Sequence, residues 1–251
     1  MSLLQKIQDW EDGRNWFDLA GLNNHLTRLH KQHIPDEDIE RELRWLEETG
    51  QLERRPGQFK LREYDPPEQT LYGKLEGHLR SGEFSIRQLD LKADTFVLQD
   101  TSKGGAQGEG RLTRPDFTLA AVRRWRFDPT ATLDVYSFEV KNRAGSSVSA
   151  VYEAFAHGRY VNYAYLVCPR SRFAESLNRA LKSTCEREGV GLILFDIQVT
   201  QLKEYSVTNV NLHVRAERRA PDPSETEKFL DRRLNDENKL RLEQLAFAGR
   251  L

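Results

Sequence analysis

Hydrophobic residues recur at helical spacing through the first 64 residues, and a strand-like alternation follows at the end of this segment. Leu26 and Leu29 share one face of a predicted second helix, and Ile39, Leu43 and Leu46 form the apolar stripe of a third. The predicted elements are helices over 3–10, 23–32 and 34–49 and a hairpin over 51–62. Three helices followed by a hairpin predict a small separate domain over 1–64.

After a proline-containing linker at 65–69, hydrophobic runs of strand length alternate with helical patterns. The predicted elements are helix 70–80, strands 94–99, 117–122 and 133–141, helix 148–159, strand 163–168, helix 173–188, strand 189–195 and further strands within 198–219. The run Tyr163–Cys168 is apolar throughout, which is typical of a strand buried on both faces. The pattern over 70–220 therefore predicts an α/β domain with a mixed sheet flanked by helices.

The last segment, 221–251, is predicted to be helical. Ser224 and Glu227 have the spacing of a capping box at the start of this helix. Its apolar residues are Phe229, Leu230, Leu234, Leu240, Leu245 and Phe247. We expect them to pack against the α/β domain or against a second copy of the chain.

Composition places the chain among globular proteins. Of its 251 residues, 38% are hydrophobic and 31% are charged, and no run approaches the roughly 18 apolar residues of a membrane span. The first residues lack a signal-peptide pattern, and Cys168 and Cys185 lack metal-ligand spacing. We therefore expect a cytoplasmic protein, with no membrane partner, whose two cysteines are free core thiols.

The net charge of −1 excludes a globally basic nucleic-acid coat. Basic residues nevertheless gather locally, near the start of the strand 117–122. This local group consists of Arg111, Arg114, Arg123, Arg124 and Arg126. Such a group either contacts phosphates or is the ordinary solvated face of a strand.

Charged residues at the ends of two predicted strands form the candidate site. Residues two apart on a strand share a face, so Glu139 and Lys141 project together while Val140 points into the core. If the strands 117–122 and 133–141 pair as a hairpin, Asp116 reaches the same end of the sheet. One or two carboxylates are enough to hold Mg²⁺ beside a phosphate. We predict Asp116 and Glu139 as ligands of Mg²⁺ or Mn²⁺, and Lys141 as a donor to the attacking water or to the transition-state charge.

The same residues also fit a plain surface role. Glu-x-Lys is common on exposed strands as a weak ion pair, and Asp90-Leu91-Lys92 repeats a similar spacing elsewhere in the chain. Glu76, on the helix 70–80, either completes the metal site or faces solvent. His157, on the helix after Lys141, is expected to be a surface or helix-packing residue.

The module over 1–64 resembles a winged-helix domain, and its most characteristic stretch runs from Trp45 to Leu52 and into the following turn. The resemblance implies DNA binding, with the third helix in the major groove and the hairpin on the backbone. The basic residues at the matching positions are Arg41, Arg44, Arg54, Arg55, Lys60 and Arg62. The third helix also carries seven acidic residues between Asp36 and Glu48, which would repel phosphates, so a protein partner is an alternative.

The segment 70–197 resembles the PD-(D/E)XK, or restriction-endonuclease-like, nuclease superfamily. The residues that carry the resemblance are Pro115-Asp116 and Glu139-Val140-Lys141, followed by a helix and the strand 163–168. The resemblance implies Mg²⁺-dependent cleavage of a phosphodiester, usually in DNA. It makes Asp116 and Glu139 metal ligands and Lys141 the catalytic lysine, and it places the Val140 carbonyl at the ion as well.

The leading hypothesis is therefore a metal-dependent endonuclease in restriction, repair or defence, with Arg114 and Arg123 contacting DNA beside the site. Because cutting both strands needs two active sites, a homodimer is a further hypothesis. Some subfamilies add a helix glutamine after the motif, where this chain has Tyr152 and Glu153. That departure favours an alternative, a catalytically inactive nuclease-fold protein that binds DNA or another protein. A transcription regulator with a ligand-sensing second domain is a third possibility.

Overall fold

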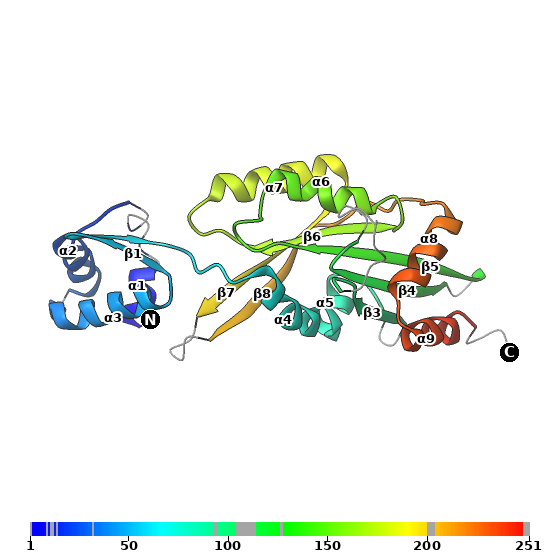
Figure 1. Cartoon of the computed structure of the whole chain (residues 1–251), viewed down its shortest axis with the longest axis horizontal. Helices are drawn as coiled ribbons and strands as arrows, with labels where there is room; N and C mark the ends of the chain where they lie inside the picture. Colours follow the sequence, from blue (N-terminus) through cyan, green and yellow to red (C-terminus); the bar gives the residue numbers. More distant parts are fainter. Residues whose placement is uncertain are drawn as a thin grey trace. The chain divides into compact units, whose positions relative to one another are not determined.

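The computed structural model describes residues 2–8, 10, 13, 15–31, 33–92, 95–103, 114–125, 128–199 and 204–247. The chain divides into two units (Figure 1). The first unit comprises 1–65 with 171–174 and 199–205, and the second comprises 66–170 with 175–198 and 206–251. The chain first passes between them at Asp65 and Pro66, inside the segment 65–69 that the sequence analysis treats as a linker.

The segment 171–174 belongs to the first unit because Glu63 and an apolar core hold it there. The Glu63 carboxylate accepts hydrogen bonds from the Ser171 hydroxyl and the Arg172 amide, both at 2.7 Å. Phe173 packs against the apolar core of the first unit. The helix predicted to start at Phe173 therefore begins later, as α7 (Glu175–Glu188).

The first unit consists of three helices and a hairpin. Its elements are α1 (Leu3–Gln8), α2 (Leu19–His30), α3 (Asp36–Glu48), β1 (Leu52–Arg55) and β2 (Gln58–Leu61). β1 and β2 pair antiparallel, and the turn between them contains Gly57 at a φ of 70°, a conformation that favours glycine. α2 starts earlier than predicted because the Asp18 side chain caps it, accepting from the Gly21 amide at 2.7 Å.

The core of the first unit follows the predicted stripe of α3 but not that of α2. Leu43 and Leu46 are fully buried on α3, as is Leu26 on α2. Leu29, predicted to share the apolar face of α2, is 59% exposed. The buried face of α2 is formed instead by Leu22 and Leu26, four residues apart, which leaves Leu29 on the flank of the helix.

The second unit is an α/β fold built on one mixed sheet. Its helices are α4 (Glu68–Arg80), α5 (Gly82–Arg87), α6 (Val148–His157), α7, α8 (Pro223–Arg233) and α9 (Asp236–Phe247). Its strands are β3 (Phe96–Asp100), β4 (Phe117–Trp125), β5 (Asp128–Val140), β6 (Tyr163–Pro169), β7 (Gly191–Val199) and β8 (Tyr205–Val214), in that spatial order. β3, β4 and β5 pair antiparallel, whereas β5, β6 and β7 pair parallel. The predicted mixed sheet flanked by helices is confirmed at this level.

Helices cover both faces of the sheet (Figure 1). On one face, α6 and α7 bury an apolar cluster with β6 and β7, and α8 buries a second with Val135 of β5 and Ala164 of β6. On the other face, the Tyr72 ring of α4 meets the Phe117 ring edge to face, with centroids 5.8 Å apart. The parallel crossover from β5 to β6 runs through α6, as the alternation of strand and helix predicts.

The C-terminal helices only partly follow the sequence expectation. α8 is capped by Asp222, whose Oδ1 accepts from the Ser224 amide at 2.8 Å, so the predicted capping role of Ser224 is wrong. The Ser224 hydroxyl donates to the same oxygen at 2.6 Å. Of the predicted packing residues, Phe229, Leu230 and Leu234 are buried against the sheet, whereas Leu240 and Phe247 are each 57% exposed.

The structure bears on the two cysteines and on the length of the helices. Cys168 and Cys185 are buried and unpaired, as predicted. Within the described ranges, no helix combines the length and the apolar character that crossing a bilayer requires.

We expect Leu43→Ala to lower the free energy of unfolding of the first unit by about 2–5 kcal/mol, because it leaves a cavity in a fully buried position. Leu29→Ala, at an exposed site of the same unit, is the matched control and should change it by under about 0.5 kcal/mol. Urea unfolding followed by tryptophan fluorescence measures both, since three of the four tryptophans lie in residues 1–65. Equal losses in the two variants would contradict this core.

Candidate active site

Pairing between β4 and β5 brings the predicted acidic residues together. Phe117 lies opposite Phe138, and the Asp116 amide extends the ladder by donating to the Phe138 carbonyl at 3.0 Å. The Asp116 side chain then folds over the end of β5, where its Oδ2 accepts from the Val140 amide at 2.7 Å. Asp116 therefore lies beside the Glu139-Val140-Lys141 segment, as the hairpin hypothesis requires.

A tyrosine from α4 holds the second oxygen of Asp116. The Tyr72 hydroxyl donates to Asp116 Oδ1 at 2.7 Å and lies 3.3 Å from a carboxylate oxygen of Glu68, one helical turn earlier. Both oxygens of Asp116 thus have a fixed donor, which sets the orientation of the carboxylate. Neither Tyr72 nor Glu68 was a predicted site residue: Tyr72 lies within the predicted helix 70–80, and Glu68 lies two residues before it.

Lys141 links the end of β5 to α6. Its Nζ lies 2.6 Å from Glu139 Oε1 and 2.8 Å from Glu153 Oε2. Glu139 and Lys141 share a face as strand alternation predicts, because the Lys141 amide continues the parallel ladder to the Val167 carbonyl at 2.9 Å. Glu153 therefore occupies the helix position next to Lys141, while the neighbouring Tyr152 is exposed and bonds to Arg187 and Glu188.

His157, at the end of α6, is buried at the same site. The residue is 1% exposed, and neither ring nitrogen has a hydrogen-bond partner among the described residues. Its Nε2 lies 3.7 Å from Glu139 Oε2, the carboxylate oxygen not used by Lys141. The expectation of a helix-packing histidine is confirmed, and the alternative of a surface histidine is wrong.

Burial and mutual repulsion make the acidic groups resist ionisation. Burial raises the pKa of Glu139 to about 8, and the nearby charge of Asp116 adds to the effect while Lys141 opposes it. Burial also raises the pKa of Asp116 to about 6, against the lowering effect of its bonds from Tyr72 and Val140. Glu68 contributes a further upward push on Asp116. Three carboxylates therefore act on one another in a small region.

The pKa values of the two basic groups of the site, Lys141 and His157, shift in opposite directions. Burial opposes the charged form of Lys141, but Glu139 and Glu153 outweigh it and raise the lysine pKa above its usual range. Burial lowers the pKa of His157 to about 3, and the charges of Lys141 and Arg233 add to this effect. The lysine is thus cationic and the imidazole neutral near neutral pH.

The oxygen donors fit a hard divalent cation in type, although they do not form a closed cage. Among the residues that the structure describes, no group of three or more His, Cys, Asp or Glu side chains is arranged to hold a metal ion. Asp116 and Glu139 provide two carboxylates, and the Val140 carbonyl is adjacent in the chain. Two such ligands with several waters are a usual set for Mg²⁺.

The acidic residue predicted on α4 is paired elsewhere. Glu76 Oε1 accepts from Arg80 Nε at 3.0 Å and from Nη2 at 2.8 Å, and Arg80 is also bonded to the Leu98 carbonyl. Glu68 is instead the α4 carboxylate that influences Asp116 and Lys141. The helix predicted over 70–80 begins two residues earlier, at Glu68, so this residue lies outside the predicted element.

The basic residues predicted to bind DNA in the first unit are mostly engaged with neighbours. Arg54 Nε lies 3.0 Å from Glu47, Arg62 pairs with Glu53, and Arg41 Nη1 lies 2.8 Å from Asp38. The Arg55 guanidinium stacks over Trp16 at 4.0 Å from the ring centroid and bonds to Gln58. Arg44 is exposed and Lys60 is half-buried.

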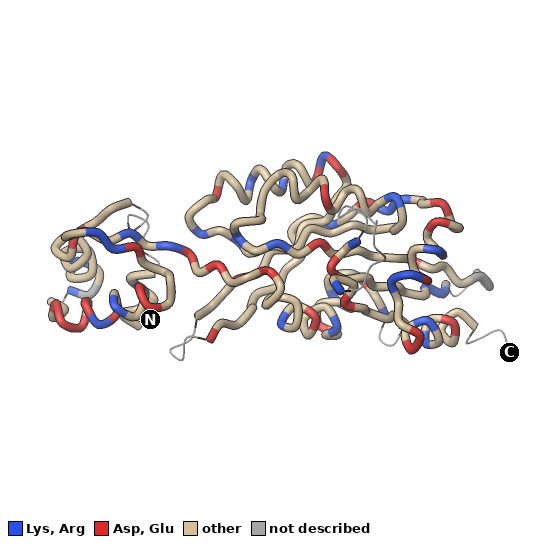
Figure 2. Tube along the Cα trace, viewed as in Figure 1, with Lys and Arg blue, Asp and Glu red and all other residues tan. Residues whose placement is uncertain are grey.

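Acidic residues outnumber basic ones along α3 (Figure 2), and the same holds for its exposed residues. The exposed acidic residues are Asp36, Glu37, Glu40, Glu47 and Glu48, against the exposed bases Arg41 and Arg44. This surface does not have the positive charge expected of a helix in a DNA groove.

The arginines near the strand β4 have different environments. Arg114 is exposed, two residues before Asp116. Arg123 is committed inside the second unit, where its Nε lies 3.0 Å from the buried Asp134 and its Nη2 donates to the Tyr136 hydroxyl at 2.8 Å. Arg123 is therefore a structural residue of the sheet in this conformation, contrary to the expectation of a free phosphate contact. Arg111 and Arg126 lie outside the described residues.

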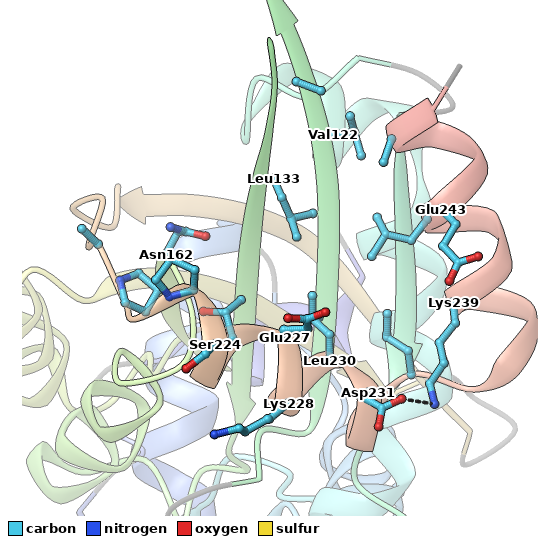
Figure 3. A pocket seen from close by; sticks show the side chains of 18 of the residues that line it. Val122, Leu133, Asn162, Ser224, Glu227, Lys228, Leu230, Asp231, Lys239 and Glu243 are labelled. Atoms are coloured by element: carbon cyan, nitrogen blue, oxygen red, sulfur yellow. Dashed lines mark hydrogen bonds and ion pairs between the residues drawn. The ribbon is translucent and has the colours of Figure 1, made fainter. Parts of the chain in front are cut away.

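A pocket of about 840 Å³ lies away from the candidate site, between β4, β5, α8 and α9 (Figure 3). Val122 and Leu133 of the strands and Leu230 of α8 supply part of its apolar wall, and an ion pair of 2.8 Å joins Asp231 to Lys239 at its rim. Asp116, Glu139 and Lys141 are not among the residues that line it.

Comparisons with known proteins assign no family. No protein-family model matches the chain, and no curated protein matches it. One solved structure is similar, the "SPO1766 protein of unknown function from Silicibacter pomeroyi", at 15% sequence identity and a TM-score of 0.39. The match covers 74% of this chain and 95% of that one. A likeness at this TM-score carries no argument about function.

We expect the metal-free protein to lose stability as the pH rises through the range set by Asp116 and Glu139. The folded pKa values, about 6 and about 8, exceed the reference values of 3.8 and 4.5, so folding binds protons and ionisation opposes it. Each group contributes stability that is complete below its unfolded pKa and is lost as the pH approaches its folded pKa. The loss amounts to at most about 1.4 kcal/mol per pH unit for each group.

Glu139→Gln should therefore flatten the fall in unfolding free energy between pH 6 and pH 8, as measured by urea unfolding in EDTA. This is the part of the Glu139 window, from 4.5 to about 8, that lies above the folded pKa of Asp116. Glu83→Gln is the control, because the Glu83 side chain is 81% exposed. Parallel pH profiles for wild type and Glu139→Gln would show that Glu139 does not titrate with a raised pKa.

Proposed function

We propose that this protein is a metal-dependent nuclease that hydrolyses phosphodiester bonds, with DNA as its substrate. The observation that carries the proposal is the convergence of Asp116, Glu139 and Lys141 at one end of the β4–β5 pair. Two buried carboxylates that resist ionisation, placed next to a cationic lysine, are costly to keep in a structural role alone. Perturbed groups of this kind concentrate at functional sites.

The arrangement of the second unit supports the resemblance to the PD-(D/E)XK nucleases. A helix, α4, precedes three antiparallel strands, and α6 then leads to the parallel strand β6. Asp116 immediately precedes the second of these strands, and Glu139 lies at the end of the third. This is the order in which that superfamily is expected to present its motif.

A divalent cation fits the acidic cluster because it would relieve the repulsion among the carboxylates. Asp116 and Glu139 would hold it, with the Val140 carbonyl alongside, and Glu68 rather than Glu76 is the α4 carboxylate whose charge acts on Asp116. The ion would polarise the scissile phosphate and offset the charge that develops on it. Mg²⁺ or Mn²⁺ is the expected cofactor.

The remaining groups of the site orient the reacting groups and donate hydrogen bonds to them. Lys141 Nζ, held between Glu139 and Glu153, can turn a hydrogen-bond donor toward the attacking water or a phosphate oxygen. Tyr72 fixes Asp116 so that the carboxylate keeps one orientation. Because the orienting partners come from α4 and α6 rather than from loops, the geometry is set before the substrate arrives.

For the first unit we propose a targeting role built on a winged-helix arrangement of α1–α3 and the β1–β2 hairpin. Arg44 on α3 and Arg55 on the hairpin are its best-placed phosphate contacts, since neither forms an ion pair with another described residue. The acidic surface of α3 favours backbone contact by the hairpin over base reading by the helix.

We expect Asp116→Ala and Lys141→Ala each to lower the rate of Mg²⁺- or Mn²⁺-dependent plasmid cleavage by at least about 10²-fold. Lys182→Ala is the matched control, because this lysine is 57% exposed on α7 and far from the motif in sequence. Circular dichroism should show that the variants remain folded, and EDTA should abolish wild-type cleavage.

Wild-type cleavage by either site variant would refute the assignment of these residues. If the wild-type protein binds DNA but cleaves none with either ion, the alternative of a catalytically inactive nuclease-fold protein would replace the proposal.

We expect the double substitution Arg44→Ala with Arg55→Ala to weaken binding of the full chain to duplex DNA and to make it less salt-dependent. Removing two phosphate contacts should reduce the slope of log affinity against log salt concentration by about 2. Arg87→Ala, at a position 78% exposed on α5, is a single-charge control. Unchanged affinity and slope in the double variant would point to a protein partner for the first unit.

A further inference from the structure

His157 lies at the candidate site with both ring nitrogens buried and without a hydrogen bond to any described residue. Its ring is buried to 1% exposure at the end of α6. Buried polar groups in folded proteins are nearly always satisfied, because leaving one unpaired costs its desolvation energy. The neutral imidazole therefore has a lone pair available to an ion that binds reversibly.

The distance between His157 and Glu139 has the length expected for two ligands of one metal ion. Nε2 and Oε2 are 3.7 Å apart, which is too long for a hydrogen bond. Two ligand atoms that are each about 2.1 Å from an ion are about 3.0 Å apart at a right angle and about 4.2 Å apart on opposite sides. The observed separation lies between these limits.

Glu139 contacts Lys141 through one carboxylate oxygen and faces His157 with the other. Oε1 is bound to Lys141 Nζ at 2.6 Å, and Oε2 is the atom that faces the imidazole. The cationic neighbours of the imidazole are Lys141 and Arg233. Four carboxyl groups, those of Glu68, Asp116, Glu139 and Glu153, lie in the same cluster, and a bound divalent ion would favour their ionised forms.

We propose that the divalent ion held by Glu139 also takes Nε2 of His157 as a ligand, so that the site selects Mn²⁺ over Mg²⁺. Mg²⁺ binds oxygen ligands almost exclusively and releases its waters reluctantly, whereas imidazole nitrogen suits transition ions. The proposal rests on the proposed nuclease function and specifies which of its two cofactors the site is built for. It makes His157 a metal ligand rather than a residue that only packs α6.

Electron spin echo envelope modulation of Mn²⁺ bound to the full chain tests the proposal directly. We expect nitrogen-14 modulation from a coordinated imidazole in the wild-type protein, and its replacement by a nitrogen-15 signal when all six histidines are labelled with ¹⁵N. This measurement needs no variant, so it stands even if substitution of the buried ring prevents folding.

His157→Gln provides the second arm. We expect it to lose the nitrogen modulation and to bind Mn²⁺ at least about tenfold more weakly by calorimetry, with a much smaller change for Mg²⁺. His213→Gln, at an exposed position on β8, is the matched control and should keep wild-type values.

Mn²⁺ bound without nitrogen modulation, or equal losses of Mn²⁺ and Mg²⁺ affinity in His157→Gln, would overturn the inference. In either case, wild-type cleavage that depends on a divalent ion would leave the proposed function standing. If the wild-type protein neither binds a divalent ion nor cleaves DNA with one, the proposed function and the inference fail together.

Discussion

The antiparallel register of β4 and β5 is the constraint on which the candidate site depends. Phe117 opposite Phe138 places the Asp116 amide on the Phe138 carbonyl and lets the Asp116 carboxylate reach the Val140 amide. A slip of one residue would turn every side chain of β5 to the other face and would carry Glu139 and Lys141 together away from Asp116. Helices cover both faces of the sheet, so such a slip would also disrupt the apolar packing on each face. The register is therefore strongly specified.

The acidic cluster is held in an unfavourable state by the rest of the fold. Asp116 and Glu139 are 9% and 8% exposed, and each resists ionisation because of burial and of the neighbouring carboxylates. Tyr72 and Val140 reduce the penalty for Asp116 but do not remove it. Apolar packing of α6, α7 and α8 on the sheet stabilises the fold that keeps these groups in place. A cation that binds the cluster would release part of this stored repulsion, which links ion binding to stability.

Sequence patterns predicted the parts of the site that lie on one strand and missed those that required a helix to be placed in space. Glu139 and Lys141 share a face because strand alternation is a local rule, and their contact follows from it. Tyr72 and Glu68 reach Asp116 only because α4 lies across the sheet and begins at Glu68, a boundary that the pattern placed two residues later. The same limit applies at helix starts, where Asp222 rather than Ser224 caps α8, since both residue types are favourable caps.

Residue patterns and composition by themselves determined the two-part organisation, the α/β class with its mixed sheet, the free buried cysteines and the pairing of Glu139 with Lys141. These follow from local spacing and composition, which the backbone geometry of helices and strands translates directly into faces. Only the tertiary structure decided that Glu68 and not Glu76 acts on Asp116, that Arg123 is paired with Asp134, and that 171–174 returns to the first unit. It also decided that His157 is buried against Glu139. Such contacts join residues far apart in sequence, and their distances depend on how whole elements pack, which no local pattern encodes.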